Sequence, residues 1–126
     1  IEQAEARLRE YGHIEFVQGD VGNLPMEDES FDIVLSMNGF HAFPDKDRAF
    51  QETWRVLKKG GEFISCFYIK GKLKQTDWLV RNILSKKGWF TPPFQTENEL
   101  KAILEKMYSK IEIHTDGAMV YFRCIK

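Results

Sequence analysis

The chain has 126 residues, 43% of them hydrophobic, and a mean hydropathy of −0.40, which indicates one globular domain with a substantial core. Eighteen basic and nineteen acidic side chains give a net charge of −1, so the overall charge favours neither a nucleic acid nor an anionic membrane as partner. No stretch resembles a secretory or transmembrane segment, and we expect a soluble, cytoplasmic protein.

Local patterns predict two elements and a loop at the start of the chain. Apolar residues recur at helical spacing over residues 1–11, and Gly12 stands where a left-handed cap would end a short surface helix. Residues 14–18 predict a strand that ends at Gly19 and Asp20. The polar, proline-bearing residues 21–30 predict a loop.

The stretch FDIVLSM, residues 31–37, is almost continuously apolar and rich in β-branched residues. It predicts the central parallel strand of a sheet, buried on both faces. A segment that begins with the small residues Asn38 and Gly39 follows at positions 38–41, where the strand's carboxyl end leaves the sheet. Ligands of open α/β sheets bind at this end.

A helix and a second buried strand are predicted after this segment. Asp45 is the expected N-cap, and residues 60–61 are glycines that end the helix. The apolar run at residues 63–69 predicts a strand parallel to residues 31–37. The expected buried stripe of the helix is Phe50, Trp54 and Leu57.

The second half of the chain predicts two more helices and a hairpin. Residues 73–87 form the first predicted helix, and an aromatic loop follows. Thr96 and Glu99 make a capping box for the next helix. Two strands joined at Asp116 and Gly117 predict an antiparallel hairpin at the end.

The cysteine and histidine residues give no metal-binding pattern. Cys66 and Cys124 each lie in an apolar, strand-like run, which favours buried, reduced thiols in a cytosolic protein. His13 and His114 have no acidic or cysteine partner at ligand spacing. We therefore expect no metal site.

The succession GDVGNLPMEDESFDIVLSMNGFHAFPD, a helix, and RVLKKGGEF resembles class I S-adenosylmethionine-dependent methyltransferases of the branch that modifies small molecules. The resemblance covers residues 14–69 closely, and the final hairpin is similar to that family's antiparallel finish. It implies an α/β fold with a Rossmann-like, mostly parallel sheet, S-adenosylmethionine as cofactor and a small-molecule acceptor.

The resemblance also implies roles for individual residues. Asp20 would accept a hydrogen bond from the adenine amino group, and Val21 would offer its backbone N–H to the ring. His41 is the nearby side chain able to act as a base, although a histidine beside two phenylalanines also suits packing. Asp20 has an alternative role as a turn residue. The segment expected to line the methionine part of the cofactor is Asn38, Gly39 and Phe40.

Aromatic residues between the two later helices suit either of two roles. Trp89, Phe90 and Phe94 could form a lid over a substrate. They could equally form an aromatic cover over the core of the sheet.

The sequence lacks the Gly-rich GxGxG loop of the family, and it begins in a helical pattern without a methionine. We therefore expect residues 1–126 to be a single partial methyltransferase domain, the C-terminal two thirds of the fold, lacking the first strands and inactive alone. Two other functions remain open: a non-catalytic methyltransferase-like subunit, or a Rossmann-type nucleotide-binding oxidoreductase.

Absence of the first strands would leave residues 31–37 with an unpaired edge. Such an edge is a template for pairing with another chain. We therefore expect a homodimer through this edge, or aggregation.

Overall fold

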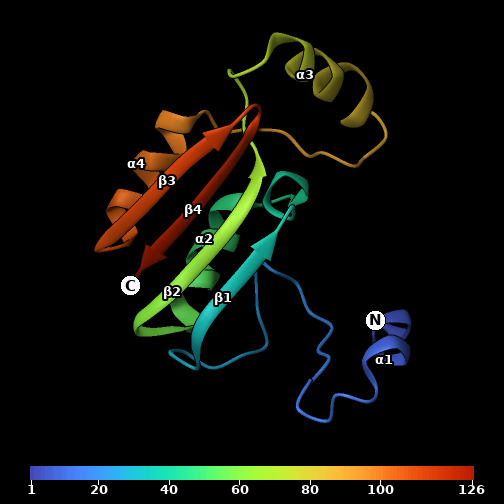
Figure 1. The fold of residues 1–126 in the computed structure, drawn as a ribbon, viewed down its shortest axis with the longest axis vertical. Coiled ribbons are helices and arrows are strands. Elements are labelled where there is room, and N and C mark those ends of the chain that lie inside the picture. The colour runs from blue at the N-terminus through green and yellow to red at the C-terminus, as the bar shows by residue number, and fades with distance from the viewer.

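The computed structural model describes residues 1–126 and contains one four-stranded sheet with the order β1-β2-β4-β3 (Figure 1). Strand β1 (Phe31–Met37) runs parallel to β2 (Leu57–Tyr68). Strand β4 (Met119–Ile125) pairs antiparallel with both β2 and β3 (Lys110–Asp116). The predicted parallel pair and the antiparallel C-terminal hairpin are therefore confirmed.

Two helices, α2 (Lys46–Val56) and α4 (Glu97–Met107), cover one face of the sheet, and both lie behind it in Figure 1. The core fills the space between them and the strands. Its largest fully buried side chains include Phe40, Phe50, Phe63, Phe67, Leu100 and Leu104.

Shorter helical segments lie outside this layer. Helix α1 (Glu2–Leu8) buries no residue and is shorter than the predicted helix. A 3₁₀ turn, η1 (Phe40–Ala42), connects β1 to α2. Helix α3 (Lys74–Leu79) continues as a π-helix, η2 (Val80–Leu84), beyond the carboxyl ends of β1 and β2 (Figure 1). No helix has the length and apolar character needed to span a bilayer.

Both helix starts that the sequence predicts are confirmed. The Asp45 carboxylate accepts a hydrogen bond from the Arg48 backbone N–H at 3.0 Å. Thr96 and Glu99 form the two reciprocal bonds of the capping box, each 3.3 Å long.

The predicted buried stripe of α2 is partly wrong. Phe50 is buried with its neighbours Ala49 and Thr53, whereas 39% of Trp54 is exposed. The buried stripe of α2 passes through positions 49, 53 and 56, so Trp54 lies at the margin of this stripe. The indole Nε1–H of Trp54 donates to the Met107 carbonyl oxygen at 2.8 Å.

Strand β1 has the predicted bounds but is neither central nor buried on both faces. It pairs only with β2, and its residues Ile33, Leu35 and Met37 are 58%, 63% and 60% exposed. Helices cover only the sheet face to which Val34 points, so strand alternation places these three side chains on the uncovered face. The expected homodimer through this edge remains a prediction.

The strand predicted at residues 14–18 does not form. This segment contains no strand residue, and both Ile14 and Val17 are exposed. A strand requires a hydrogen-bonded neighbour, and Figure 1 shows the N-terminal arm running beside the sheet without joining it.

Replacing Leu104 by alanine should lower the free energy of unfolding by about 2–5 kcal/mol, because Leu104 is fully buried between α4 and the sheet. Leu35→Ala is the matched control, since the same atoms are removed from the exposed face of β1. Urea unfolding followed by circular dichroism measures both. Equal losses in the two variants would contradict the one-sided core.

Candidate functional site

The candidate site lies at the carboxyl ends of β1 and β2. The turn that leaves β1 begins at Asn38, which has a φ of 55° and donates its backbone N–H to the Cys66 carbonyl oxygen at 2.8 Å. A Cβ atom added to Gly39 would lie 2.9 Å from the Phe43 ring and 3.1 Å from the Ser36 hydroxyl. A side chain at position 39 would therefore displace the Phe43 ring, so glycine is the residue that fits this turn without a shift.

Phe40 anchors this turn in the core. The centroid of its ring lies 4.5 Å from that of Phe50, 5.5 Å from that of Phe67 and 5.7 Å from that of Phe63. Only 1% of Phe40 is exposed. The ring thus faces away from the strand end, and only the backbone of Phe40 can contact a ligand there.

Asp20 and Val21 lie in a tight turn of the N-terminal arm. The Asp20 carboxylate accepts the Gly22 N–H at 2.9 Å through Oδ1, while Oδ2 is exposed and makes no hydrogen bond. Val21 is half-buried and packs against the core. The structure therefore shows Asp20 as a turn residue, with one carboxylate oxygen still available to a ligand.

Arg55 of α2 holds the loop that follows this turn, a role that the sequence analysis missed. Its guanidinium donates to the Leu24 and Met26 carbonyl oxygens at 3.0 and 2.8 Å and pairs with Asp28 at 2.7 Å. Glu52 accepts from Arg55 and from the Leu24 N–H, and the Arg55 bonds lower the pKa of Glu52. Opposite charges three residues apart on α2, facing an acidic loop, are the signal that could have indicated this contact.

His41 is half-buried between the strand end and the aromatic loop. Its ring stacks on Phe90 with 4.1 Å between centroids, and its Nδ1 accepts the Tyr68 N–H at 3.4 Å. Burial, reinforced by the charge of Lys46, lowers the pKa of His41. With Nδ1 accepting, the neutral imidazole carries its proton on Nε2 and is a donor at that atom. The contacts favour a packing role, and a role as general base remains a prediction.

The aromatic loop is fastened to this turn by polar contacts. Thr91 donates its N–H to the His41 carbonyl oxygen and its hydroxyl to the Ala42 carbonyl oxygen, both at 2.9 Å. The Lys46 ammonium donates to the Phe43 and Thr91 carbonyl oxygens. The loop, η1 and the start of α2 are therefore connected as one unit.

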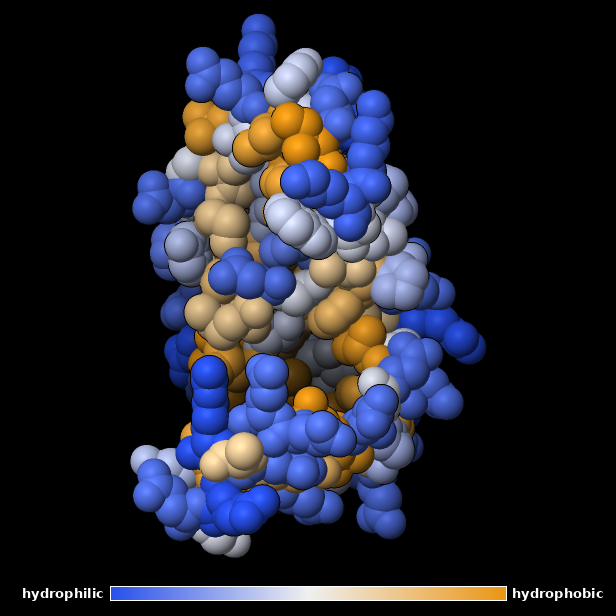
Figure 2. All heavy atoms as spheres, turned by 90° about the vertical axis from the view of Figure 1, so that its right-hand side faces the viewer, coloured by the Kyte–Doolittle hydropathy of each residue, from blue (hydrophilic) through white to orange (hydrophobic).

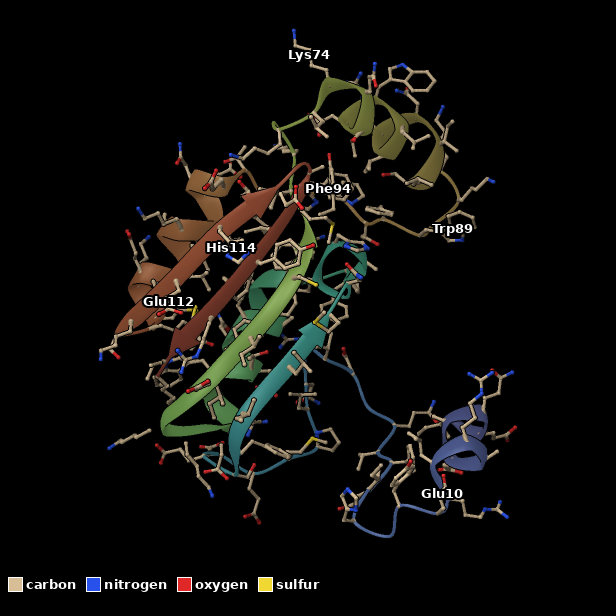
Figure 3. The ribbon with its side chains drawn as sticks, viewed as in Figure 1. Glu10, Lys74, Trp89, Phe94, Glu112 and His114 are labelled. Atoms are coloured by element: carbon tan, nitrogen blue, oxygen red, sulfur yellow. The ribbon has the colours of Figure 1, made fainter.

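The three aromatic residues of the loop separate into two environments. Phe90 and Phe94 pack on the Tyr68 ring, with centroids 5.6 and 5.4 Å away. Trp89 is 59% exposed and points away from the sheet (Figure 3). Phe90 and Phe94 thus extend the core, as one of the two interpretations predicted, and Trp89 does not.

A cavity of about 510 Å³ opens beside this loop at the end of β2. Its polar centre is the Tyr68 hydroxyl, which donates to Asp77 at 2.5 Å, while the other Asp77 oxygen accepts the Gly71 N–H. The sequence analysis did not single out this pair. The cavity is lined by Tyr68, Lys70, Gly71, Asp77, Arg81, Pro92, Pro93, Phe94 and Thr96.

A family described as "Methyltransferase domain" matches residues 1–65, which is more than half of the chain and includes the Asp20 turn and the turn that follows β1. This chain belongs to the methyltransferase domain family. The resemblance based on residues 14–69 is thereby confirmed.

Two named relatives share parts of the sequence. The phthiotriol/phenolphthiotriol dimycocerosates methyltransferase of Mycobacterium tuberculosis is 48% identical over 50 residues, which cover 40% of this chain and 18% of the relative. The ubiquinone/menaquinone biosynthesis C-methyltransferase UbiE of Idiomarina loihiensis is 36% identical over 81 residues, 61% of this chain and 32% of the relative. The chain therefore matches only a fifth to a third of the length of these proteins.

The fold matches a solved structure along almost the whole chain. A protein of Thermotoga maritima, described as a SAM-dependent methyltransferase and possible histamine N-methyltransferase, superposes with a TM-score of 0.77 at 23% identity. The match covers 99% of this chain and 70% of that protein. It confirms the Rossmann-like methyltransferase fold.

Acidification should destabilise the chain partly through His41. Because its pKa is lowered in the folded state, the unfolded chain binds the proton more readily, so stability falls as the pH drops through 6.5. When the pH is lowered from 7.5 to 5.5, we expect the free energy of unfolding of His41→Gln to fall less than that of the unchanged chain. Urea unfolding at both pH values measures this difference. His13→Gln, at an exposed position, is the matched control. An identical pH dependence of the chain and His41→Gln would contradict the buried environment of His41.

Proposed function

We propose that the protein carrying this sequence transfers a methyl group from S-adenosylmethionine to a small-molecule acceptor. The observation that carries the proposal is the family match over residues 1–65, which includes the Asp20 turn and the segment from Asn38 to His41. Because this chain spans a minority of the curated relatives' length, the proposal concerns the whole protein.

The available polar groups fit this cofactor. The free Oδ2 of Asp20 can accept a hydrogen bond from the adenine amino group, and the Val21 N–H can bond to the ring. The Asn38 side chain and the backbone at Gly39 lie at the strand end, where the methionine part would be held. When bound, S-adenosylmethionine supplies a methyl group on a sulfonium, so the protein's task is to position the acceptor and exclude water.

The cavity beside Tyr68 is the proposed acceptor site. Its walls include the rings of Tyr68 and Phe94 and two prolines, which suit an apolar body. Arg81 is exposed and supplies a polar group for orientation. One relative is named a phthiotriol/phenolphthiotriol dimycocerosates methyltransferase, and the other is named a C-methyltransferase of ubiquinone/menaquinone biosynthesis. These names support an apolar acceptor that carries a polar group.

The proposed compartment is the cytoplasm. Cys66 and Cys124 are both free and buried, and burial raises the pKa of the Cys124 thiol to about 12. Free thiols that are buried suit a reducing compartment.

Family membership argues against the oxidoreductase alternative. A non-catalytic subunit is the competing function, and cofactor binding separates the two. The catalytic proposal requires binding of S-adenosylmethionine and transfer of its methyl group, whereas a purely structural subunit requires neither.

Asp20→Ala should weaken S-adenosylmethionine binding by about tenfold or more, because a hydrogen bond to a charged group contributes about 1.5–3 kcal/mol. Isothermal titration of the protein carrying this sequence measures the affinity. Glu105→Ala is the control, since it removes an exposed carboxylate of α4 away from the strand ends. Unchanged affinity in Asp20→Ala would contradict the adenine role, and no binding to the unchanged protein would contradict the proposed function.

A further inference from the structure

Residues 70–90, here called the cap, carry a charge that the whole-chain composition hides. They contain six basic side chains and one acidic side chain, a net charge of +5. Because the whole chain has a net charge of −1, the other 105 residues carry −6. The cap contains α3 and η2 and lies beyond the carboxyl ends of β1 and β2 (Figure 1). One end of the molecule is therefore strongly basic.

Most of these positive charges are free to meet a partner. Lys72 pairs with Glu97, but the other five basic side chains of the cap are exposed and form no ion pair. The only carboxylate, Asp77, is occupied by Tyr68 and Gly71. The five cations without an ion pair are Lys70, Lys74, Arg81, Lys86 and Lys87, and the Lys87 ammonium lies 5.0 Å from the centroid of the Trp89 ring.

The same surface exposes large apolar side chains. Val80 and Leu84 of η2 face inward and pack with Tyr68, so the inner side of η2 is already covered by the rest of the protein. The outer side nevertheless keeps apolar residues in solvent, and Figure 2 shows an apolar area surrounded by hydrophilic atoms near the top of the molecule. Figure 3 shows Lys74 and Trp89 pointing outward from the cap. The exposed apolar residues are Leu73, Trp78, Leu79, Ile83 and Trp89.

We propose that the cap docks on the surface of an anionic lipid bilayer. Basic side chains are attracted to anionic headgroups, and tryptophan prefers the boundary between headgroups and acyl chains. The aliphatic side chains Leu79 and Ile83 gain from burial below that boundary. They offer nothing to a phosphate backbone, so a bilayer fits the cap better than a nucleic acid does.

The charge on the rest of the chain gives the docked protein an orientation. Residues outside the cap, with their net charge of −6, are repelled by the surface that attracts the cap. Arg81 belongs to the cap and also lines the cavity beside Tyr68. Docking would therefore hold that cavity close to the bilayer. This inference stands on charge and exposure and does not rest on the proposed methyl transfer.

Flotation with lipid vesicles tests the proposal on the 126-residue chain. We expect binding to vesicles of phosphatidylcholine with phosphatidylglycerol in a 3:1 ratio, and much weaker binding to phosphatidylcholine alone. The double variant K86E/K87E should reduce binding at least tenfold, because each lysine near an anionic surface contributes about a fivefold factor in affinity. K58E/K59E is the matched control, since it changes the net charge equally at the opposite end of β2.

A second variant tests the apolar contribution. Trp78 is 55% exposed, so Trp78→Ser should leave the fold intact and still weaken vesicle binding. Equal binding to both vesicle types, or equal effects of K86E/K87E and K58E/K59E, would overturn the proposal. Release of the chain from vesicles by a duplex DNA at lower concentration than the lipid would also overturn it, in favour of a nucleic-acid partner.

Discussion

The burial of the Phe40 ring between α2 and β2 is the interaction on which the site depends. It fixes the turn after β1, because a ring packed against four other phenylalanine rings is held in one position. That position sets the direction of the backbone from Asn38 to His41 and the start of α2. The aromatic loop then follows through Thr91, which bonds to the same turn. Packing in the core thus determines the geometry at the strand ends.

Local signals in the sequence predicted much of this fold. The Asp45 cap, the capping box of Thr96 and Glu99, and the C-terminal hairpin all depend on residues close together in the chain, and all are present. The position of β1 could not be predicted in the same way, because apolar runs do not reveal whether a neighbouring strand exists. Residues 14–18 failed as a strand for the same reason.

The site shows the same division between local and distant information. The sequence predicted the loops at Asp20 and at Asn38 to His41, but it did not predict the core position of the Phe40 ring. Arg55 and the Tyr68–Asp77 pair escaped notice because their partners are defined by the tertiary fold. Net charge is limited for a related reason, since an average over the chain removes the contrast between the basic cap and the acidic remainder.

A crystal structure of the protein carrying this sequence with S-adenosylhomocysteine tests the central claim most directly. The account predicts the adenine amino group within hydrogen-bonding distance of Asp20 Oδ2, and the homocysteine part beside the turn at Asn38 and Gly39. A ligand bound on another surface, with the Asp20 turn and the end of β1 in contact with solvent alone, would contradict it.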